Sequence, residues 1–434
     1  MTPLIWRIKA KGLIRHTEEQ LFMNSLSPAL QDKKVGVIGF NARPIALSLK
    51  HAGAETYVSD YWGDLDLKKA SDSCIAVLSP TPGIRQRQPL YKPLPELLLD
   101  NFFELTKNIE LDHIIVGSGF DDNSDLLIPL EKTGKLLGCS TKQIKNARDR
   151  NEISNAIKSL DVQLPTQFTA FSFDELKPDT LTFPLVCRKL VSGGGRGLRL
   201  ARNYEELHYY MKKSTSEEEI HRPVIQQYVE GTDISCSVLG TGSKSVVLST
   251  QNQLIGMPTA GRNNDFVYCG NYCPSSISSQ IRGKIEHISQ VLCNKLELRG
   301  SIGIDYIVDD EEKIWLMEIN PRIQGTLEML ELASNVSIMT LHVQATFGDL
   351  PRETINFQPV VKMIVYSRKS GILDDLPHFT NIVDKSPPGI YLEQGDPICT
   401  VLQTGQDIKQ CYSHISNIAL QIQREIRSIE DRRK

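Results

Sequence analysis

The stretch that most constrains this chain is residues 302–328, in which two apolar, β-branched segments flank an acidic turn. The turn spans Asp309 to Lys313, and this composition predicts a β-hairpin. Asp305 lies on the first predicted strand, and Glu318 and Asn320 lie on the second. Side chains two positions apart leave a strand on the same face, so Glu318 and Asn320 share one. A loop of about four residues would place Asp305 opposite Glu318 on that face.

These three residues carry the oxygen atoms that hard cations prefer. Carboxylate and amide oxygens suit Mg²⁺, which usually also binds substrate phosphates. Arg322 follows, and its guanidinium group matches the shape of phosphate or carboxylate. The alternative is a hairpin whose acids simply face water. We favour a metal site formed by Asp305, Glu318 and Asn320, because the second strand is otherwise apolar and solvated acids rarely come with Asn and Arg at this spacing.

A glycine-rich loop follows an apolar strand predicted at residues 184–190, within the sequence FPLVCRKLVSGGGRGLRLA. Glycines let backbone N–H groups approach phosphate oxygens closely, and they let a loop close over a nucleotide. A simple hairpin loop is the alternative, and the pattern is not a Walker loop. Consecutive glycines framed by cations favour phosphate binding. The residues assigned to this role are Arg188, Lys189, Gly193, Gly194, Gly195, Arg196 and Gly197.

Two weaker signals concern a nucleotide. A strand predicted at residues 224–229 leads into the turn EGTD, whose Asp233 could accept hydrogen bonds from ribose hydroxyls. Near the start, the βαβ pattern of residues 34–59 contains Gly36 and Gly39 and is followed by Asp60, which together resemble a dinucleotide-binding turn. The third glycine of that motif is missing, so we favour plain α/β scaffolding there.

The remaining pattern predicts further elements by periodicity and by turn residues. Strands are expected at residues 74–78, 113–116, 360–366 and 398–402, and helices at 141–160, 278–296, 326–347 and 406–427. Residues 251–274, with several Gly, Asn and Pro, are expected to form a long loop or lid.

Length and composition exclude several classes of protein. A chain of 434 residues exceeds one compact core and suggests two to four domains. Its 40% hydrophobic and 23% charged residues are ordinary for a soluble globular protein, and a net charge of −3 gives no reason to expect a nucleic-acid partner. No run is long and apolar enough to cross a membrane. The start lacks the form of a signal peptide, and nine scattered cysteines favour a reduced, cytoplasmic location.

Taken in order, the motifs resemble the ATP-grasp superfamily: a P-x-x-x-[KR] strand, the G-G-G-x-G loop, the E-G-x-[DE] turn and a D-(x₁₂)-E-x-N-x-R hairpin. The segment EINPRIQG is similar to the biotin carboxylase and carbamoyl-phosphate synthase branch. The segments GFNARP and GDPICTV resemble predicted ATP-dependent carboligases. The resemblance implies an α/β protein with α+β elements and the ATP-grasp fold. Its expected segments are an N-terminal extension (1–33), a Rossmann-like pre-ATP-grasp domain (34–133), the ATP-grasp domain (134–348, central lobe about 183–250) and a small C-terminal domain (349–434).

The resemblance also implies the ligands. ATP would lie between the lobes, with its ribose near Asp233 and one or two Mg²⁺ ions (or Mn²⁺) on the hairpin, Glu318 bridging them. Its adenine would lie against Gln226, Gln227, Tyr228 and Val229. Arg322 would be the catalytic residue that stabilises the transferred phosphoryl group. Arg150 and Arg188 stand where most members have phosphate-contacting lysines, which is not a conservative replacement.

The function implied is an ATP- and Mg²⁺-dependent carboxylate–amine ligase that forms an acylphosphate and releases ADP and phosphate. The alternatives are a bicarbonate-activating carboxylase and a non-catalytic ATP-binding protein. The expected partners are a small carboxylate and a small amine, with no nucleic acid and no membrane. Because superfamily members are often dimers, a homodimer is a further option.

Overall fold

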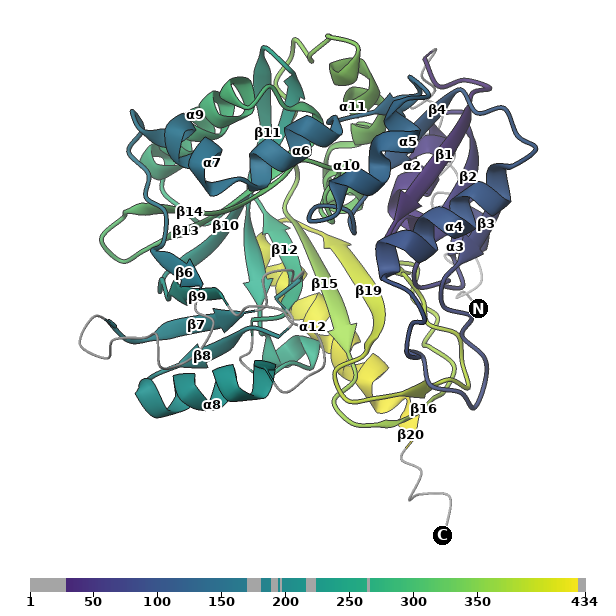
Figure 1. Cartoon of the computed structure of the whole chain (residues 1–434). Helices are drawn as coiled ribbons and strands as arrows, with labels where there is room; N and C mark the ends of the chain where they lie inside the picture. Colours follow the sequence, from purple (N-terminus) through teal and green to yellow (C-terminus); the bar gives the residue numbers. More distant parts are fainter. Residues whose placement is uncertain are drawn as a thin grey trace, which may run out of the picture.

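In a computed structural model, the described residues of the chain form four β-sheets with helices packed on them (Figure 1). The structure describes residues 29–169, 181–188, 194–195, 197–215, 224–263 and 266–427. The expected extension at residues 1–33 lies almost wholly outside these ranges, as do Lys189, Gly193 and Arg196 of the glycine-rich segment.

The first sheet is a five-stranded parallel sheet with the order β3-β2-β1-β4-β5, as the βαβ pattern predicted. Its strands are β1 (Lys34–Gly39), β2 (Glu55–Asp60), β3 (Ser73–Ala76), β4 (His113–Val116) and β5 (Leu136–Leu137). The helices that accompany it are α2 (Arg43–His51), α3 (Leu67–Ala70), α4 (Leu94–Thr106), the 3-10 helix η1 (Ser124–Leu127) and α5 (Ile128–Glu131). Because the chain returns from β3 to β4 on the far side of β1, the strand order reverses between β1 and β4, and such a switch point is where open α/β sheets bind ligands.

Gly36 and Asp60, which resembled parts of a dinucleotide-binding motif in the sequence, have structural roles in the fold. A Cβ atom on Gly36 would lie 2.6 Å from the Phe102 ring of α4, so this glycine allows the helix to pack on the sheet. The buried Asp60 carboxylate accepts hydrogen bonds from the backbone N–H groups of Ala42 and Gly63, at 2.8 and 2.9 Å. Plain scaffolding, the favoured interpretation, accounts for both residues.

The second and largest sheet has eight strands in the order β14-β13-β10-β11-β12-β15-β19-β17. Every neighbouring pair in it is antiparallel. The strands are β10 (Thr232–Thr241), β11 (Ser245–Ile255), β12 (Tyr268–Cys273), β13 (Arg299–Val308), β14 (Ile314–Asn320), β15 (Val360–Tyr366), β17 (Ile382–Val383) and β19 (Pro397–Thr404). Helices α9 (Ser279–Lys295), α10 (Leu327–Ser334), α11 (Ile338–Thr346) and α12 (Ile408–Arg424) pack on it, and the 3-10 helix η4 (Pro258–Ala260) follows β11.

Alternation along β10 and β13 separates an apolar face from a polar one. Ile302, Ile304 and Tyr306 are buried in one cluster with Ile281 and Ile285 of α9. The intervening positions of a strand point to the opposite face. The polar residues of β10 and β13 therefore share the face away from α9.

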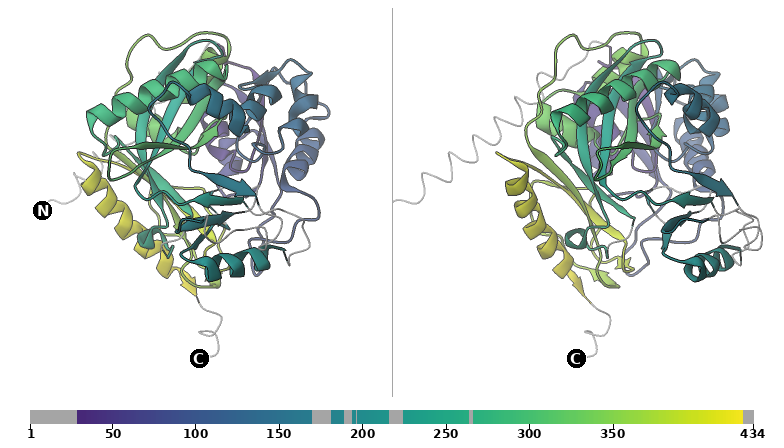
Figure 2. Two further views of the ribbon diagram at one scale, coloured as in Figure 1. Left: turned by 60° about the vertical axis from the view of Figure 1, so that its left-hand side comes forward. Right: turned by 90° about the vertical axis from the view of Figure 1, so that its left-hand side faces the viewer.

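Two smaller sheets complete the described part of the chain. The four-stranded antiparallel sheet β6-β9-β7-β8 carries helix α8 (Tyr204–Thr215) and stands beside the large sheet, at the lower left in Figure 1 and at the lower right in the right-hand view of Figure 2. It contains β6 (Gln167–Thr169), β7 (Leu185–Arg188), β8 (Arg199–Ala201) and β9 (Val224–Gln227). The third sheet contains β16 (Gly371–Leu373), β18 (Tyr391–Leu392) and β20 (Ile426–Arg427).

Two expected long helices are each two shorter helices. The pattern of residues 141–160 divides into α6 (Thr141–Arg148) and α7 (Arg150–Ile157), because Asp149 adopts an extended conformation and its carboxylate caps the second helix through Asn151 and Glu152. The pattern of residues 326–347 divides into α10 and α11 at Asn335, which has a left-handed φ of 57°. Periodicity continues across both breaks, so it could not reveal them.

The expected lid at residues 251–274 is wrong at both ends. Residues up to Ile255 continue β11, and Tyr268–Cys273 forms β12 in the middle of the large sheet. The division into domains stays a prediction. The large sheet nevertheless crosses the boundary expected at residue 348, since β12 pairs with β15.

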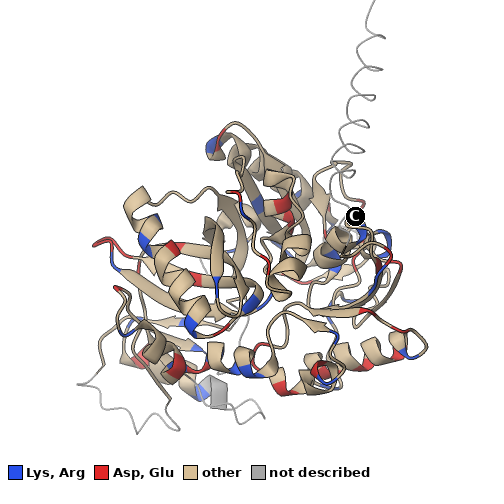
Figure 3. Cartoon of the chain, turned by 90° about the horizontal axis from the view of Figure 1, so that it is seen from above, with Lys and Arg blue, Asp and Glu red and all other residues tan. Residues whose placement is uncertain are grey.

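Three further features bear on the expectations from composition. No helix among the described residues is long and apolar enough to cross a membrane. All nine cysteines are free thiols. Acidic and basic residues are mixed over the face seen from above (Figure 3).

Candidate active site

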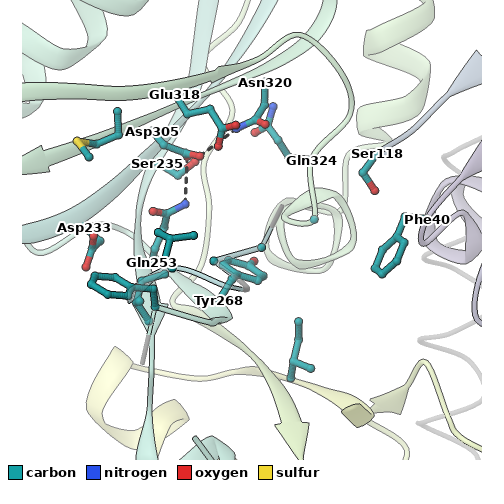
Figure 4. Close-up of a pocket in the computed structure, with 18 of the residues that line it drawn as sticks. Phe40, Ser118, Asp233, Ser235, Gln253, Tyr268, Asp305, Glu318, Asn320 and Gln324 are labelled. Atoms are coloured by element: carbon teal, nitrogen blue, oxygen red, sulfur yellow. Dashed lines mark hydrogen bonds between the residues drawn. The ribbon is translucent and has the colours of Figure 1, made fainter. Parts of the chain in front are cut away.

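A cavity of about 1280 Å³ opens where the first sheet, the small sheet and the large sheet meet. Phe40 and Asn41 follow β1, and Ser118 and Gly119 follow β4, so one wall lies at the switch point of the first sheet. The hairpin β13–β14 forms the opposite wall, and Figure 4 shows Phe40 and Ser118 across the opening from Asp305 and Glu318.

The hairpin brings its two carboxylates together as the sequence predicted. In the β13–β14 register Asp305 is paired with Glu318 and Gly303 with Asn320, with a register shift after Asp305. Asp305, Glu318 and Asn320 all line the cavity, and Figure 4 shows the Asp305 and Glu318 carboxyl groups on the same side of the hairpin.

Asp305 is held by neutral donors. Its two oxygens accept hydrogen bonds from Gln253 Nε2 at 3.1 Å and from Asn320 Nδ2 at 3.0 Å (Figure 4). Burial, followed by the negative charge of Glu318, raises the pKa of Asp305 to about 7. A hydrogen bond from Ser235 opposes this shift. The carboxyl pair therefore carries electrostatic repulsion that a cation would relieve.

Two arginines border this pair. Arg148, at the end of α6, donates to Glu318 and forms an ion pair with Asp122 at 3.0 Å. Arg322 donates from Nε to both oxygens of Asp121 at 3.0 Å, and from Nη2 to Asn320 Oδ1 at 3.0 Å. Both side chains line the cavity and place fixed positive charge beside the predicted metal ligands.

The two arginines singled out from the sequence do not line the cavity, although the charges of Glu318 and Arg148 act on Arg188. Arg150 is not among the cavity-lining residues, and its guanidinium group donates to the Pro165 carbonyl. Arg188 donates to Gln226 Oε1 at 3.2 Å on the small sheet, and burial lowers its pKa. Sequence interpretation missed Arg148. The break at Asp149 explains this, because it points the last residue of α6 and the first residue of α7 in different directions.

The described part of the glycine-rich loop packs against the segment Phe266–Val267, which leads into β12. Gly194 and Gly195 line the cavity, with φ angles of 61° and 73°. A Cβ atom on Gly195 would lie only 1.7 Å from the Phe266 carbonyl oxygen. The loop therefore needs glycine here both for its left-handed backbone and for this close approach.

The segment expected to bind adenine also reaches the cavity. Gln226, Gln227, Tyr228, Val229 and Asp233 all line it. Burial raises the pKa of Asp233 to about 6. Sequence interpretation missed the apolar lining around this segment: Val186 and Leu200 of the small sheet, and Ile307 and Met317 of the hairpin. These four occupy ordinary strand positions, so no motif identified them.

The donor set fits a hard divalent cation. The set consists of two carboxylates and one amide, and Mg²⁺ is typically bound by one or two carboxylates together with substrate phosphates. Among the described residues no group of three or more His, Cys, Asp or Glu side chains could hold a metal ion, so a site rich in nitrogen or sulfur ligands is not found there. A hard ion shared with a nucleotide is the kind of ligand this arrangement can take.

Residues 147–326 match the family model described as the ATP-grasp domain, and 89% of the chain is covered by a solved structure of the corresponding fold. The chain is similar to the biotin carboxylase domain of Hydrogenobacter thermophilus 2-oxoglutarate carboxylase, whose structure is a dimer in complex with MgADP, ADP and bicarbonate. The two share 18% identity, with a TM-score of 0.69 and 89% of each chain covered. N5-carboxyaminoimidazole synthetase from Staphylococcus aureus, complexed with ADP, matches with 16% identity, a TM-score of 0.66, and 90% of this chain and 97% of that chain covered. L-amino acid ligase from Bacillus licheniformis matches with 14% identity, a TM-score of 0.66, and 90% of this chain and 98% of that chain covered.

Residues 147–326 are therefore identified as an ATP-grasp domain, and the chain shares its fold with biotin carboxylase, as the order of its motifs predicted. The predicted α/β ATP-grasp fold is confirmed. The expected class, ATP-dependent ligases that use ATP and Mg²⁺, agrees with these matches.

Proposed function

We propose that this chain is an ATP- and Mg²⁺-dependent ligase that joins a small carboxylic acid to an amine. The observation that carries the proposal is the convergence of the hairpin carboxylates and two arginines on one cavity, with Gly194 and Gly195 at its edge. Asp305, Glu318 and Asn320 are the proposed metal ligands, and Arg322 is the proposed catalytic cation.

The proposed chemistry has two steps. A carboxylate oxygen of the acid attacks the γ-phosphorus of ATP, and the bond to ADP breaks. The amine nitrogen then attacks the acyl carbon of the acylphosphate, phosphate leaves, and the nitrogen loses a proton. Both reactants of the first step are anions, so the barrier falls mainly through positioning and charge neutralisation.

The residues of this chain supply much of that neutralisation. Arg148 and Arg322 lie on either side of the Asp305–Glu318 pair and can face phosphoryl and acyl oxygens. When bound, Mg²⁺ would add Lewis-acid charge at the phosphates. The contact between the glycine-rich loop and Phe266 narrows the cavity edge and so helps to exclude water from the acylphosphate.

The test follows ADP release by the full chain with MgATP and defined pools of carboxylic acids, with and without pooled amines. Hydroxylamine added in place of amines would trap an acylphosphate as a hydroxamate. ADP release that needs an acid, together with hydroxamate formation, supports the ligase. ADP release with bicarbonate and no amine would establish the carboxylase instead, and tight ATP binding without ADP release would establish a non-catalytic protein.

A further inference from the structure

Aromatic side chains that the proposed phosphoryl transfer does not use form part of the cavity wall that faces the hairpin. Phe40, in the turn after β1, and Trp62, shortly after β2, both line the cavity. Tyr61 stacks on Phe40, with ring centroids 4.8 Å apart and 13° between the ring planes. Trp62 stands nearly perpendicular to both, with centroids 5.4 Å from Phe40 and 4.9 Å from Tyr61. Three rings are therefore fixed against one another at the switch point of the first sheet.

One face of the Phe40 ring is open to a ligand. Tyr61 covers the other face, and Trp62 lies beside the stack rather than on it. Phe40 is half-buried and lines the cavity, and Figure 4 shows its ring next to Ser118, beside the open part of the cavity. Aromatic rings prefer stacked or edge-to-face partners. A flat ring placed there would extend the Tyr61–Phe40 stack, with Trp62 at the side of the stack.

Two hydrogen-bond donors on this wall are within reach of a ligand. The Trp62 Nε1–H group has no hydrogen-bond partner among the described residues, although indole N–H groups in such positions usually find one. Unlike the amide oxygens of Asn41 and Gln86 nearby, it is not enclosed by protein atoms. The same holds for the Ser118 hydroxyl group, which also lines the cavity. Both groups can therefore bind an acceptor atom at the edge of a ring.

The charged groups nearest the rings give the wall no strong net charge. Arg87 lies over the Trp62 ring, with its Cζ atom 5.2 Å from the centroid, and pairs with Asp396 at 3.0 Å. Asp64 lines the cavity, and its carboxyl group has no hydrogen-bond or ion-pair partner among the described residues. Burial, followed by the charge of Asp384, raises the pKa of Asp64 well above its ordinary value, which favours the uncharged form.

The cations farther along this wall are held by the protein itself. Arg43 is 1% exposed, forms a bidentate pair with Glu328 and pairs with Asp384 at 2.6 Å. The Lys362 side chain donates to the Gly325 carbonyl, and the charges of Asp384 and Glu328 act on it. Charges of both signs thus offset one another, so an uncharged flat group is the kind of ligand that suits this wall.

The aromatic rings lie within the length of one small molecule from the proposed reaction centre. The Phe40 backbone N–H donates to the Ser118 carbonyl at 2.8 Å. Asp121, three residues after Ser118, accepts from Arg322 Nε at 3.0 Å. Three residues span at most about 11 Å even when fully extended. A substrate whose ring stacks on Phe40 can therefore extend a short chain toward Arg322.

We propose that one substrate of the ligase carries an aromatic ring, which stacks on the open face of Phe40 beside Trp62. The inference rests on the proposed ligase function, because it assigns the ring to one of the two substrates of that reaction. Leu94 and Pro95, at the start of α4, add apolar lining to the same cavity. The ring occupies the wall opposite the hairpin, so it leaves the proposed nucleotide site free.

Binding by matched ligands tests the ring site without turnover. The full chain is titrated calorimetrically with two pairs that differ only in the ring: 3-phenylpropanoate with 3-cyclohexylpropanoate, and 2-phenylethylammonium with 2-cyclohexylethylammonium. In one pair we expect the phenyl compound to bind about two- to tenfold more tightly, because stacking adds to the burial of area. A preference in the acid pair assigns the ring to the acid, and one in the amine pair assigns it to the amine. Equal binding within both pairs overturns the proposal.

Substitutions assign the preference to this wall. Phe40→Leu should remove it, whereas Phe40→Tyr, which keeps the flat face, should retain it. Phe103→Leu is the control, since Phe103 is an exposed phenylalanine of α4 on the same domain. Trp62→Leu should reduce the preference and serves if Phe40→Leu fails to fold. A full preference in a folded Phe40→Leu or Trp62→Leu protein contradicts the assignment.

The hydroxylamine assay keeps the two proposals distinguishable, because the binding experiment needs no turnover. Hydroxamate formation by the wild-type chain, together with equal binding of phenyl and cyclohexyl ligands, removes the ring site and leaves the ligase. A preference for phenyl ligands without hydroxamate formation removes the ligase and leaves a binding site for an aromatic ligand.

Discussion

The two walls of the cavity are built in different ways. The hairpin wall places Asp305, Glu318 and Asn320 within one local unit, in which a short turn fixes the register. The facing wall gathers Asn41, Asp64 and residues near 384 from the first domain and from the C-terminal part of the chain. The hairpin wall is held by local strand pairing, whereas the facing wall depends on long-range contacts.

Buried charge also differs between the walls. Arg43 reaches from α2 to Glu328 of α10 and to Asp384 before β19, so the facing wall is fixed by ion pairs between distant segments. The hairpin wall uses neutral donors around Asp305, and its Glu318 side chain is 41% exposed. We therefore expect substitutions at the hairpin to lower the rate of ADP release with little loss of stability. Substitutions behind the facing wall should lower the free energy of unfolding with less effect on that rate.

The largest effect is expected for Glu318→Gln. The substitution removes a charged metal ligand while keeping its size, so ATP turnover should fall by at least about a thousandfold. The midpoint of thermal unfolding should change little, because the side chain is partly exposed. The rate of ADP release measures turnover, and differential scanning calorimetry measures the unfolding midpoint. Near-normal turnover would contradict the metal-site assignment.

Arg43→Met should instead lower the stability of the fold more than the rate of turnover. Removing one partner of a buried ion pair leaves uncompensated carboxylates and typically costs about 3–5 kcal/mol. The free energy of unfolding in urea should fall by that amount. Lys50→Met on the same helix is the control, since Lys50 pairs with Asp72 near the surface and should cost less than about 1 kcal/mol. Equal losses for the two variants would show that the buried network does not hold the wall.

Arg148 and Arg150 allow a matched test of the hairpin wall. Arg148→Ala should lower the rate of ADP release by about a hundredfold, because it removes a fixed cation beside Glu318. Arg150→Ala should lower it by no more than a few fold, since this side chain donates to Pro165 outside the cavity lining. Steady-state kinetics of the two variants decide between the arginines, and a larger loss for Arg150→Ala would reverse the assignment.

The smallest expected effect concerns the pH dependence of stability that arises from His342 of α11, which contacts strand β13 of the hairpin. His342 is buried, accepts a hydrogen bond from the Ser301 backbone N–H at 2.9 Å, and has its pKa lowered to about 4 by burial. In the unfolded chain its pKa is near 6.5, so between pH 6.5 and 4 the unfolded state binds more protons. Its stabilising contribution is complete above pH 6.5 and decreases as the pH falls.

From these pKa values, His342 should account for about 2 kcal/mol of stability lost between pH 7 and pH 5. Urea unfolding of the wild type and of His342→Gln at both pH values measures this. The variant should be less stable at pH 7 but lose less on acidification. Parallel losses in the two proteins would show that this histidine is not the titrating group.

Local sequence predicted those parts of the site that depend on strand period and turn chemistry. The facing of Asp305 and Glu318 followed from alternation and a short loop, and the ATP-grasp fold followed from the order of the motifs. Local patterns did not predict the ends of helices where the apolar periodicity continues across a break in the backbone. Asp149 and Asn335 each divide an expected helix, and the strands β11 and β12 occupy the two ends of an expected lid.

The sequence by itself determined the hairpin, the glycine positions and the kind of ligand they suit, because neighbouring residues fix strand register and backbone freedom. Only the tertiary structure decided which arginine enters the cavity and which acids remain without partners. Asp64 and Asp384 are separated by most of the chain, yet both line the cavity and the charge of Asp384 acts on Asp64. Their electrostatic environment depends on how distant segments pack, and no local pattern encodes that packing.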